Sequence, residues 1–256
     1  MSCCPENSLP YLAPSYTVKG TIQAHSNGHE FYVSGDPTLK KAVLIIPDIY
    51  GWNGGRTRNI ADYYADNGYY AIVPKILQPA MEGAVDGDGH ADVPFNLQYT
   101  ISITWEGCVQ PRVQSMIEHL KSVGIEKAVM IGFCWGGWVL AHTLSDSEMS
   151  GLFVCGAVPH PSIQLEQAYG GKPVELLSRV TRPMLLMPAQ NDSDSYREGG
   201  EWFEALLMNN PSSATIDFPT MTHGWVPRGD VSIPGMEAEV ERALSSMLAF
   251  FKAHDI

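Results

Sequence analysis

The stretch "KAVMIGFCWGGWVLA", residues 127–141, joins two apolar runs through a glycine-rich turn that carries one cysteine. The first run has the β-branched and apolar composition of a buried strand, and the second leads into an apolar helix. Glycines stand two residues before and two residues after Cys134. The stretch therefore predicts a sharp strand-to-helix turn with Cys134 at its tip.

Three interpretations of this turn differ in what they require. A dinucleotide-binding turn needs G-x-G-x-x-G, but Cys134 occupies the place of the second glycine, and G-x-x-x-x-G-K-[ST] does not occur. A buried structural cysteine needs no small residues on either side. A nucleophile elbow, here G-x-C-x-G, does need them, because strand and helix cross closely. The pattern favours Cys134 as a nucleophile whose thiolate is stabilised by the amino end of the helix.

The rest of the chain predicts an α/β fold with a mostly parallel central sheet and helices on both faces. Several apolar runs are hydrophobic throughout, as in strands that are buried on both sides, and they alternate with amphipathic stretches. We expect strands at 30–34, 42–47, 69–74, 127–132, 151–158, 183–188 and 214–218. We expect helices at 57–67, 111–123, 136–145, 199–209 and 235–253.

Domain organisation follows from the same pattern. We expect residues 1–19 to form an extended N-terminal segment and residues 20–256 to form a single domain, with a loop excursion around 76–108 that is rich in Gly, Asp and Pro. The motif "DGDGHAD" in that loop fails the spacing of a calcium-binding EF-hand. Cys3 and Cys4 lack the context for lipidation or zinc binding, and we expect a mobile end there.

Composition argues against several classes of partner and location. The formal net charge of −12 disfavours binding to nucleic acid, and no apolar stretch approaches the ~20 residues that span a bilayer. The N-terminus does not resemble a secretory signal. Five scattered cysteines suit a reducing compartment better than a disulfide framework, so we expect a cytoplasmic protein.

The order of candidate catalytic residues supports the elbow. Hydrolases of this architecture present nucleophile, acid and histidine in that order, the acid after a later strand and the histidine near the C-terminus. Asp192 and Asp194 follow the expected strand at 183–188, and His223 follows the one at 214–218. We favour Asp192 because it lies nearer the end of its strand. The backbone N–H of Trp135 would face a developing oxyanion.

Two further residues are candidates for the substrate pocket. His160 follows the end of an expected strand, where α/β proteins gather their sites. Trp138 belongs to a group of aromatic residues near the elbow that suggests a flat or aromatic pocket. Core packing explains either residue as well.

The sequence resembles the dienelactone hydrolase family of α/β-hydrolases, which includes carboxymethylenebutenolidase-like proteins. The resemblance covers most of residues 20–254 and rests on four segments: "GFCWGG" at the elbow, "PAQNDSDS" at the acid, "THGW" at the histidine and "IPDIYGWN" after an early strand. It implies an α/β-hydrolase fold in which Cys134, His223 and Asp192 act together. No metal or organic cofactor is implied.

The fourth segment implies further roles. The family typically has a glutamate there that contacts the resting cysteine, and the next residue's N–H forms part of the oxyanion hole. This chain has Asp48, one methylene shorter, followed by Ile49. Asp48 modulates the thiol in this interpretation, or simply caps the turn. Arg228 lies near a position where family members hold a substrate carboxylate, although it also suits a solvated loop.

The expected activity is therefore cysteine-dependent hydrolysis of a small ester or lactone, which is anionic if Arg228 binds it. Two alternatives stay open. One is a broader carboxylesterase or thioesterase on the same site, and the other is a non-catalytic scaffold or thiol redox sensor that uses Cys134. For the sensor, Cys155 or Cys108 would have to approach Cys134 in space.

Overall fold

The computed structural model describes residues 4–82 and 97–256. Its centre is a sheet of eight strands in the order β1-β2-β4-β3-β5-β6-β7-β8. β1 and β2 pair antiparallel with their neighbours, and β3 to β8 run parallel. The strands are β1 (Thr21–Ala24), β2 (Glu30–Ser34), β3 (Lys41–Ile46), β4 (Tyr70–Pro74), β5 (Lys127–Gly132), β6 (Phe153–Pro159), β7 (Met184–Met187) and β8 (Ala214–Thr215).

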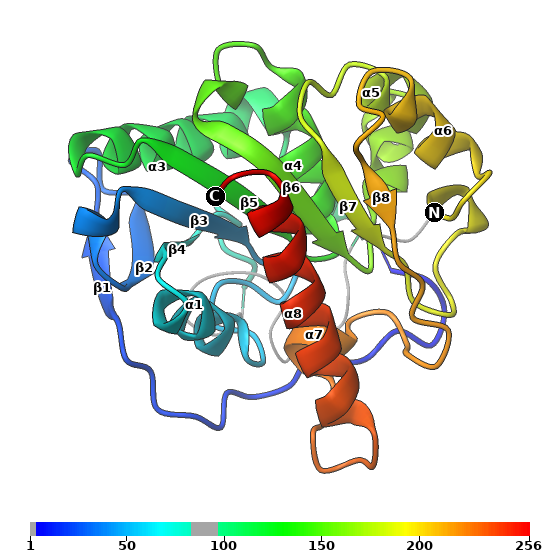
Figure 1. The fold of residues 1–256 in the computed structure, drawn as a ribbon, viewed down its shortest axis with the longest axis horizontal. Coiled ribbons are helices and arrows are strands. Elements are labelled where there is room, and N and C mark those ends of the chain that lie inside the picture. The colour runs from blue at the N-terminus through cyan, green and yellow to red at the C-terminus, as the bar shows by residue number, and fades with distance from the viewer. Residues whose placement is uncertain (1–3, 83–96) are drawn as a thin grey trace.

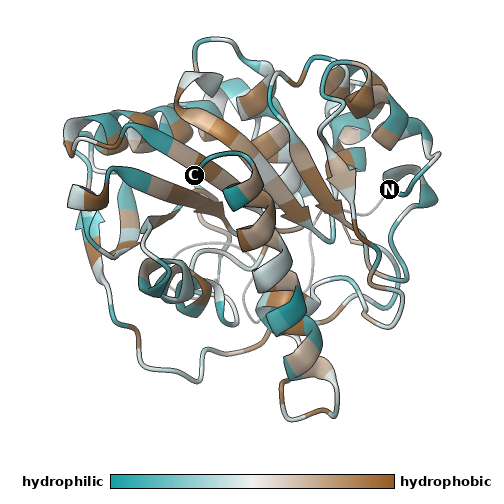
Figure 2. Ribbon diagram, viewed as in Figure 1, coloured by the Kyte–Doolittle hydropathy of each residue, from teal (hydrophilic) through white to brown (hydrophobic). Residues whose placement is uncertain are grey.

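Helices cover both faces of the sheet, as expected of parallel strands that are apolar on both sides (Figures 1 and 2). One face packs against α1 (Thr57–Asp66) and α8 (Met236–Ala253), with the short α7 (Trp225–Arg228) nearby. The other packs against α3 (Gln110–Ser122) and α4 (Trp135–Ser145), backed by α5 (Pro173–Leu177) and α6 (Glu201–Leu207). Each face has its own cluster of buried apolar side chains.

This arrangement confirms the predicted α/β-hydrolase fold. The seven expected strands and five expected helices all form, with ends that shift by a few residues. The predicted apolar face of the last helix is buried in α8: Met236, Val240, Ala243, Leu244, Met247, Leu248 and Phe251. The proposed division at residue 20 stays a prediction.

Two regions differ from expectation. β1 forms although no strand was expected there; its four residues are all exposed, so no apolar run marks it. The end of the expected loop at 76–108 is helical, with α2 (Leu97–Ser102) followed by a π-helical turn (Trp105–Val109). The expected "DGDGHAD" loop, 86–92, lies outside the described residues. Within 4–82 and 97–256, every helix is too short or too polar to cross a bilayer.

Candidate active site

The carboxyl ends of the parallel strands bring the candidate residues to one edge of the sheet. Asp48 follows β3, Cys134 follows β5, His160 follows β6 and Asp192 follows β7. His223 comes after β8 and just before α7. Since parallel strands point the same way, residues far apart in the sequence meet at this edge, where α/β proteins bind their ligands.

Cys134 lies at the tip of a strained turn between β5 and α4. Its backbone has φ 53° and ψ −114°, a conformation that non-glycine residues rarely adopt. The flanking glycines permit the turn: a Cβ on Gly132 would collide with the backbone of Gly136, and a Cβ on Gly136 would lie 2.5 Å from the carbonyl oxygen of Ile46. The predicted elbow geometry is thus present, with Cys134 immediately before the first turn of α4.

His223 and Asp192 form a buried pair. Nδ1 of His223 lies 2.5 Å from Oδ1 of Asp192, and both side chains are almost fully buried. The second carboxylate oxygen accepts a hydrogen bond from the N–H of Ala189 at 2.7 Å. The competing candidate, Asp194, is 99% exposed and pairs with Arg197. The structure therefore places Asp192, and not Asp194, beside the histidine.

The remaining nitrogen of His223 faces the elbow. A ring nitrogen of His223 lies within 4.8 Å of the sulfur of Cys134. Nδ1 is engaged by Asp192, which leaves Nε2 to face the thiol. Burial alone would lower the pKa of His223, but the negative charges of Asp192 and Cys134 outweigh it and hold that pKa well above its usual range. The environment thus favours the protonated form of His223.

Two backbone N–H groups are available for an oxyanion. Ile49 follows β3, and Trp135 is the first residue of α4. Within the described part of the chain, neither N–H donates a hydrogen bond to a protein acceptor. An acyl-transfer site requires backbone donors that are left unused in this way.

Asp48 is both a turn cap and half of an ion pair. Oδ1 accepts from the N–H of Tyr50 at 2.9 Å, and Oδ2 accepts from Nε of Arg228 at 2.7 Å. Burial raises the pKa of the Asp48 carboxyl against the opposing charge of Arg228, and the nearby Cys134 raises it further. Arg228 is itself buried and lies over the ring of Tyr50. It is not a solvated loop residue.

His160 is completely buried beside the pair. Its ring centroid lies 4.8 Å from that of His223, and within the described residues neither ring nitrogen has a hydrogen-bond partner. Burial lowers the pKa of His160 to about 3, against a smaller opposing effect of Cys134. His160 is therefore a neutral imidazole at physiological pH.

The comparisons with known proteins agree with this architecture. The sequence profile of the dienelactone hydrolase family matches residues 30–255. The chain belongs to the dienelactone hydrolase family. A carboxymethylenebutenolidase homologue from Homo sapiens is 29% identical over 63% of this chain, and the match spans only 60% of that relative's own length.

Other members and a solved structure extend the comparison. A carboxymethylenebutenolidase homologue from Xenopus tropicalis is 26% identical over 81% of this chain and 80% of its own length. A Klebsiella pneumoniae protein assigned as a dienelactone hydrolase superposes with a TM-score of 0.64 at 15% identity, and the superposition covers 93% of this chain and 99% of that one. At that identity the superposition supports the fold alone.

Trp138 lines a separate pocket of this dienelactone hydrolase family member. The pocket holds about 170 Å³ between α4 and the π-helical turn, next to Trp105 and Tyr169. Nε1 of Trp138 donates to Oε2 of Glu166 at 2.7 Å, and its ring stacks on Tyr169. Trp138 is also in ring contact with Trp135, at the start of the same helix. The expected role of Trp138 in binding substrate stays a prediction.

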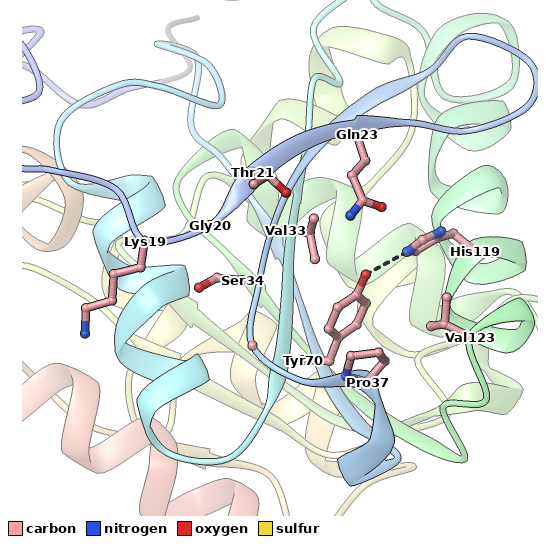
Figure 3. A pocket seen from close by; sticks show the side chains of 11 residues that line it. Lys19, Gly20, Thr21, Gln23, Val33, Ser34, Pro37, Tyr70, His119 and Val123 are labelled. Atoms are coloured by element: carbon pink, nitrogen blue, oxygen red, sulfur yellow. Dashed lines mark hydrogen bonds between the residues drawn. The ribbon is translucent and has the colours of Figure 1, made fainter.

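A larger hollow lies away from this edge (Figure 3). It holds about 420 Å³ beside β1 and β2, and its lining includes Tyr70 and His119, whose side chains are hydrogen-bonded at 3.0 Å. Tyr70 is the first residue of β4. The hollow thus lies toward the amino ends of the parallel strands, and it contains none of the candidate residues.

Two neighbours of the thiol were not foreseen from the sequence. Oγ of Ser162 lies 3.3 Å from Sγ of Cys134, and Sγ of Cys4 lies 3.5 Å from it. Cys4 was expected in a mobile end, yet it packs against the core; Cys3 lies outside the described residues. No local motif marks either contact, since each joins segments distant in the sequence.

One set of side chains at this edge has the spacing of metal ligands. The sulfurs of Cys4 and Cys134 and a nitrogen of His223 lie within 4.8 Å of one another. Such ligands suit a thiophilic ion such as zinc. An ion bound there would occupy the sulfur of the candidate nucleophile.

Proposed function

We propose that the protein hydrolyses a small ester or lactone by two-step acyl transfer through Cys134. The observation that carries this proposal is the elbow at Cys134 facing a buried His223–Asp192 pair. Family membership supports the same reaction class. The matched segment spans only 60% of the human relative, so the activity and substrate of this chain are our proposal and do not follow from that relative.

Each residue has a defined role in this mechanism. The Cys134 thiolate attacks the carbonyl carbon, and the resulting oxyanion accepts hydrogen bonds from the N–H groups of Ile49 and Trp135. The imidazolium of His223 protonates the leaving alkoxide. His223 then removes a proton from water, which attacks the thioester and releases the acid. Asp192 holds Nδ1 of the imidazole and thereby presents Nε2 to the reacting atoms.

Arg228 is our candidate for binding a substrate carboxylate. Nε pairs with Asp48 and Nη1 donates to the carbonyl of Pro10 at 3.1 Å, but Nη2 is buried without a protein partner in the described residues. A buried guanidinium N–H that lacks an acceptor favours an anionic ligand. We propose that His160 and Trp138 also contribute to substrate binding. We also propose a cytoplasmic location, because the five cysteines are odd in number and scattered along the sequence.

The decisive test compares hydrolysis of p-nitrophenyl acetate and a panel of dienelactones, simple esters and thioesters by wild type, Cys134→Ala and His223→Ala. We expect both variants to lose activity while keeping their circular dichroism spectra. Cys155→Ala, which removes a thiol from the opposite core layer, is the matched control and should stay active. An active Cys134→Ala variant would refute the mechanism. The preferred panel member separates the dienelactone activity from the broader esterase or thioesterase.

Arg228 needs its own test. Arg228→Lys keeps the charge but loses the forked geometry of the guanidinium. We expect kcat/KM for a carboxylate-bearing lactone to fall by more than kcat/KM for its methyl ester. Equal losses on the two substrates would mean that Arg228 stabilises the fold or positions Asp48 and does not bind the substrate carboxylate.

A further inference from the structure

Cys4 touches the proposed nucleophile across 130 residues of sequence. The two sulfurs are 3.5 Å apart, compared with about 2.05 Å in a disulfide. They are thus two reduced thiols in contact, and an approach of about 1.5 Å would join them. Cys134 is fully buried, whereas Cys4 is partly exposed.

Residues 4–12, the part of the N-terminal segment that carries Cys4, are hydrogen-bonded across the active-site edge. Figure 1 shows this N-terminal segment passing below the arrowheads of the central strands. Four hydrogen bonds tie it to the loops that build the site: Asn191 Nδ2 to the carbonyl of Glu6 (2.9 Å), the N–H of Leu9 to the carbonyl of His223 (2.9 Å), Arg228 Nη1 to the carbonyl of Pro10 (3.1 Å), and the N–H of Gly55 to the carbonyl of Leu12 (2.8 Å). The contact between Cys4 and Cys134 is therefore supported by the surrounding backbone.

We propose that Cys4 and Cys134 form a reversible disulfide under peroxide, and that this bond switches the site off. The loss of activity rests on the proposed function, whereas formation of the bond does not. With the disulfide in place, Cys134 has no thiolate to offer a carbonyl carbon. The N-terminal segment is then held over the site by a covalent bond as well as by its four hydrogen bonds.

The chemistry is a two-electron oxidation with hydrogen peroxide as the oxidant. The Cys134 thiolate attacks one peroxide oxygen and the O–O bond breaks; the departing hydroxide takes the proton of the His223 imidazolium and leaves as water. Cys134 is now a sulfenic acid. The Cys4 sulfur attacks the Cys134 sulfur, the S–O bond breaks, and the hydroxyl leaves as a second water with the Cys4 proton. A dithiol reductant reverses the bond by exchange.

The other described cysteines are poorly suited to this step. Cys155 lies within β6 on the opposite core layer, and burial raises the pKa of its thiol to about 12, so it stays protonated. Cys108 lies on the π-helical turn, where its sulfur is 3.8 Å from the carbonyl of Ser102. The resolving cysteine sought from the sequence is thus Cys4 and not Cys155 or Cys108.

The experiment maps disulfides in wild type, Cys4→Ser and Cys3→Ser. Each protein, with EDTA present to exclude bound metal, is treated with a small excess of hydrogen peroxide, blocked with N-ethylmaleimide, digested without reductant and analysed by mass spectrometry. We expect a peptide pair linked through Cys4 and Cys134 in wild type and in Cys3→Ser, together with a loss of esterase activity that dithiothreitol restores. Cys4→Ser should give no linked pair, and its Cys134 should proceed to sulfinic acid with a loss that dithiothreitol does not restore.

Three results would overturn the proposal: no linked pair in wild type, a link from Cys134 to another cysteine, or the same reversible inactivation in Cys4→Ser. Failure of the proposed function gives a different pattern. A reduced wild type that is inert toward the whole ester panel, yet still forms the Cys4–Cys134 peptide, would contradict the hydrolase and support the disulfide.

Discussion

Two imidazoles at the same strand edge have opposite protonation because of their neighbours. His160 and His223 are both fully buried, and their rings are in edge-to-face contact. Burial is the largest influence on His160, and it lowers the pKa of this residue to about 3. His223 has Asp192 at 2.5 Å and Cys134 close by, and its pKa rises well above the usual range. The neighbouring groups therefore decide which of the two histidines holds a proton.

Replacing Asp192 with Asn tests this role of the carboxylate. The amide keeps the size of the side chain but loses the charge that supports the imidazolium and its tautomer. We expect kcat to fall by roughly 10²–10⁴-fold with a small change in KM, by analogy with triads in which the acid is neutralised. Asp194→Asn, at a 99% exposed position, is the control and should stay close to wild type. Similar losses in both variants would argue against Asp192 as the orienting acid.

His160 makes a prediction about stability and pH. Its pKa is about 3 in the folded protein and near 6.5 when unfolded, so the unfolded chain binds more protons between these values. The free energy of unfolding should thus be undiminished above about pH 6.5 and fall as the pH drops toward 3, by up to about 1.4 kcal/mol per pH unit from this residue.

His160→Gln should lessen that dependence, because glutamine does not titrate. Urea unfolding of wild type and variant between pH 4 and 7.5 measures how steeply the free energy of unfolding of each protein changes with pH. This measurement does not depend on the catalytic activity of the variant. An unchanged slope in the variant would show that His160 is not the group that titrates on unfolding.

At the scale of elements, the turn between β5 and α4 depends on the absence of two side chains. The helix starts so close to the strand that Gly136 approaches the carbonyl of Ile46 at the end of β3. Glycine is required here for close approach of backbones. The same packing holds Cys134 at its positive φ, so the position of the proposed nucleophile and the contact between β3 and α4 are coupled.

Gly136→Ala should therefore disturb both stability and the site. Its Cβ would lie 2.5 Å from a backbone oxygen that has little freedom to move. We expect a loss of about 1–3 kcal/mol in unfolding free energy, typical of overpacking, together with reduced activity. Gly151→Ala is the matched control, since no atom lies within 4 Å of its Cβ position. Thermal and urea unfolding of both variants measure the difference; equal stability would mean that α4 shifts freely.

The elements that could be predicted are those whose sequence shows, by composition or periodicity, which of their faces are buried. The parallel strands are apolar throughout, and α8 shows one apolar face, so composition and periodicity identify them. β1 could not be predicted, because it is an exposed edge strand held by main-chain hydrogen bonds to β2. α2 was missed because only Thr100 of its six residues is buried, which gives no apolar stripe.

At the scale of the whole molecule, the site combines residues that local sequence patterns predict with contacts between segments that are far apart in the sequence. Cys134, Asp192 and His223 each follow a recognisable strand, so the chain order and a turn motif were enough to propose them. The contacts of Cys4 with Cys134 and of Arg228 with Asp48 join segments 130 and 180 residues apart. Such contacts depend on how segments that are distant in the sequence meet in the folded chain, which no local sequence pattern predicts.

The N-terminal segment crosses the edge at which Cys134, His160 and His223 are each 0% exposed. If Cys134 is the nucleophile that we propose, we expect substrate to displace the segment before it reaches the thiol. Leu9 is one anchor, through the hydrogen bond from its N–H to the carbonyl of His223. Leu9→Pro removes that donor, whereas Leu9→Ala removes only the side chain and keeps the bond.

We expect Cys134 to be alkylated by iodoacetamide about fivefold faster in Leu9→Pro than in Leu9→Ala, which corresponds to one hydrogen bond of ~1 kcal/mol. Alkylation of Cys134 is followed by peptide mass spectrometry under reducing conditions, with Cys155 in the same samples as an internal control that should stay slow. Equal rates in the two variants would show that this anchor does not limit opening. A faster rate at Cys155 as well would indicate general loosening of the fold rather than release of the segment.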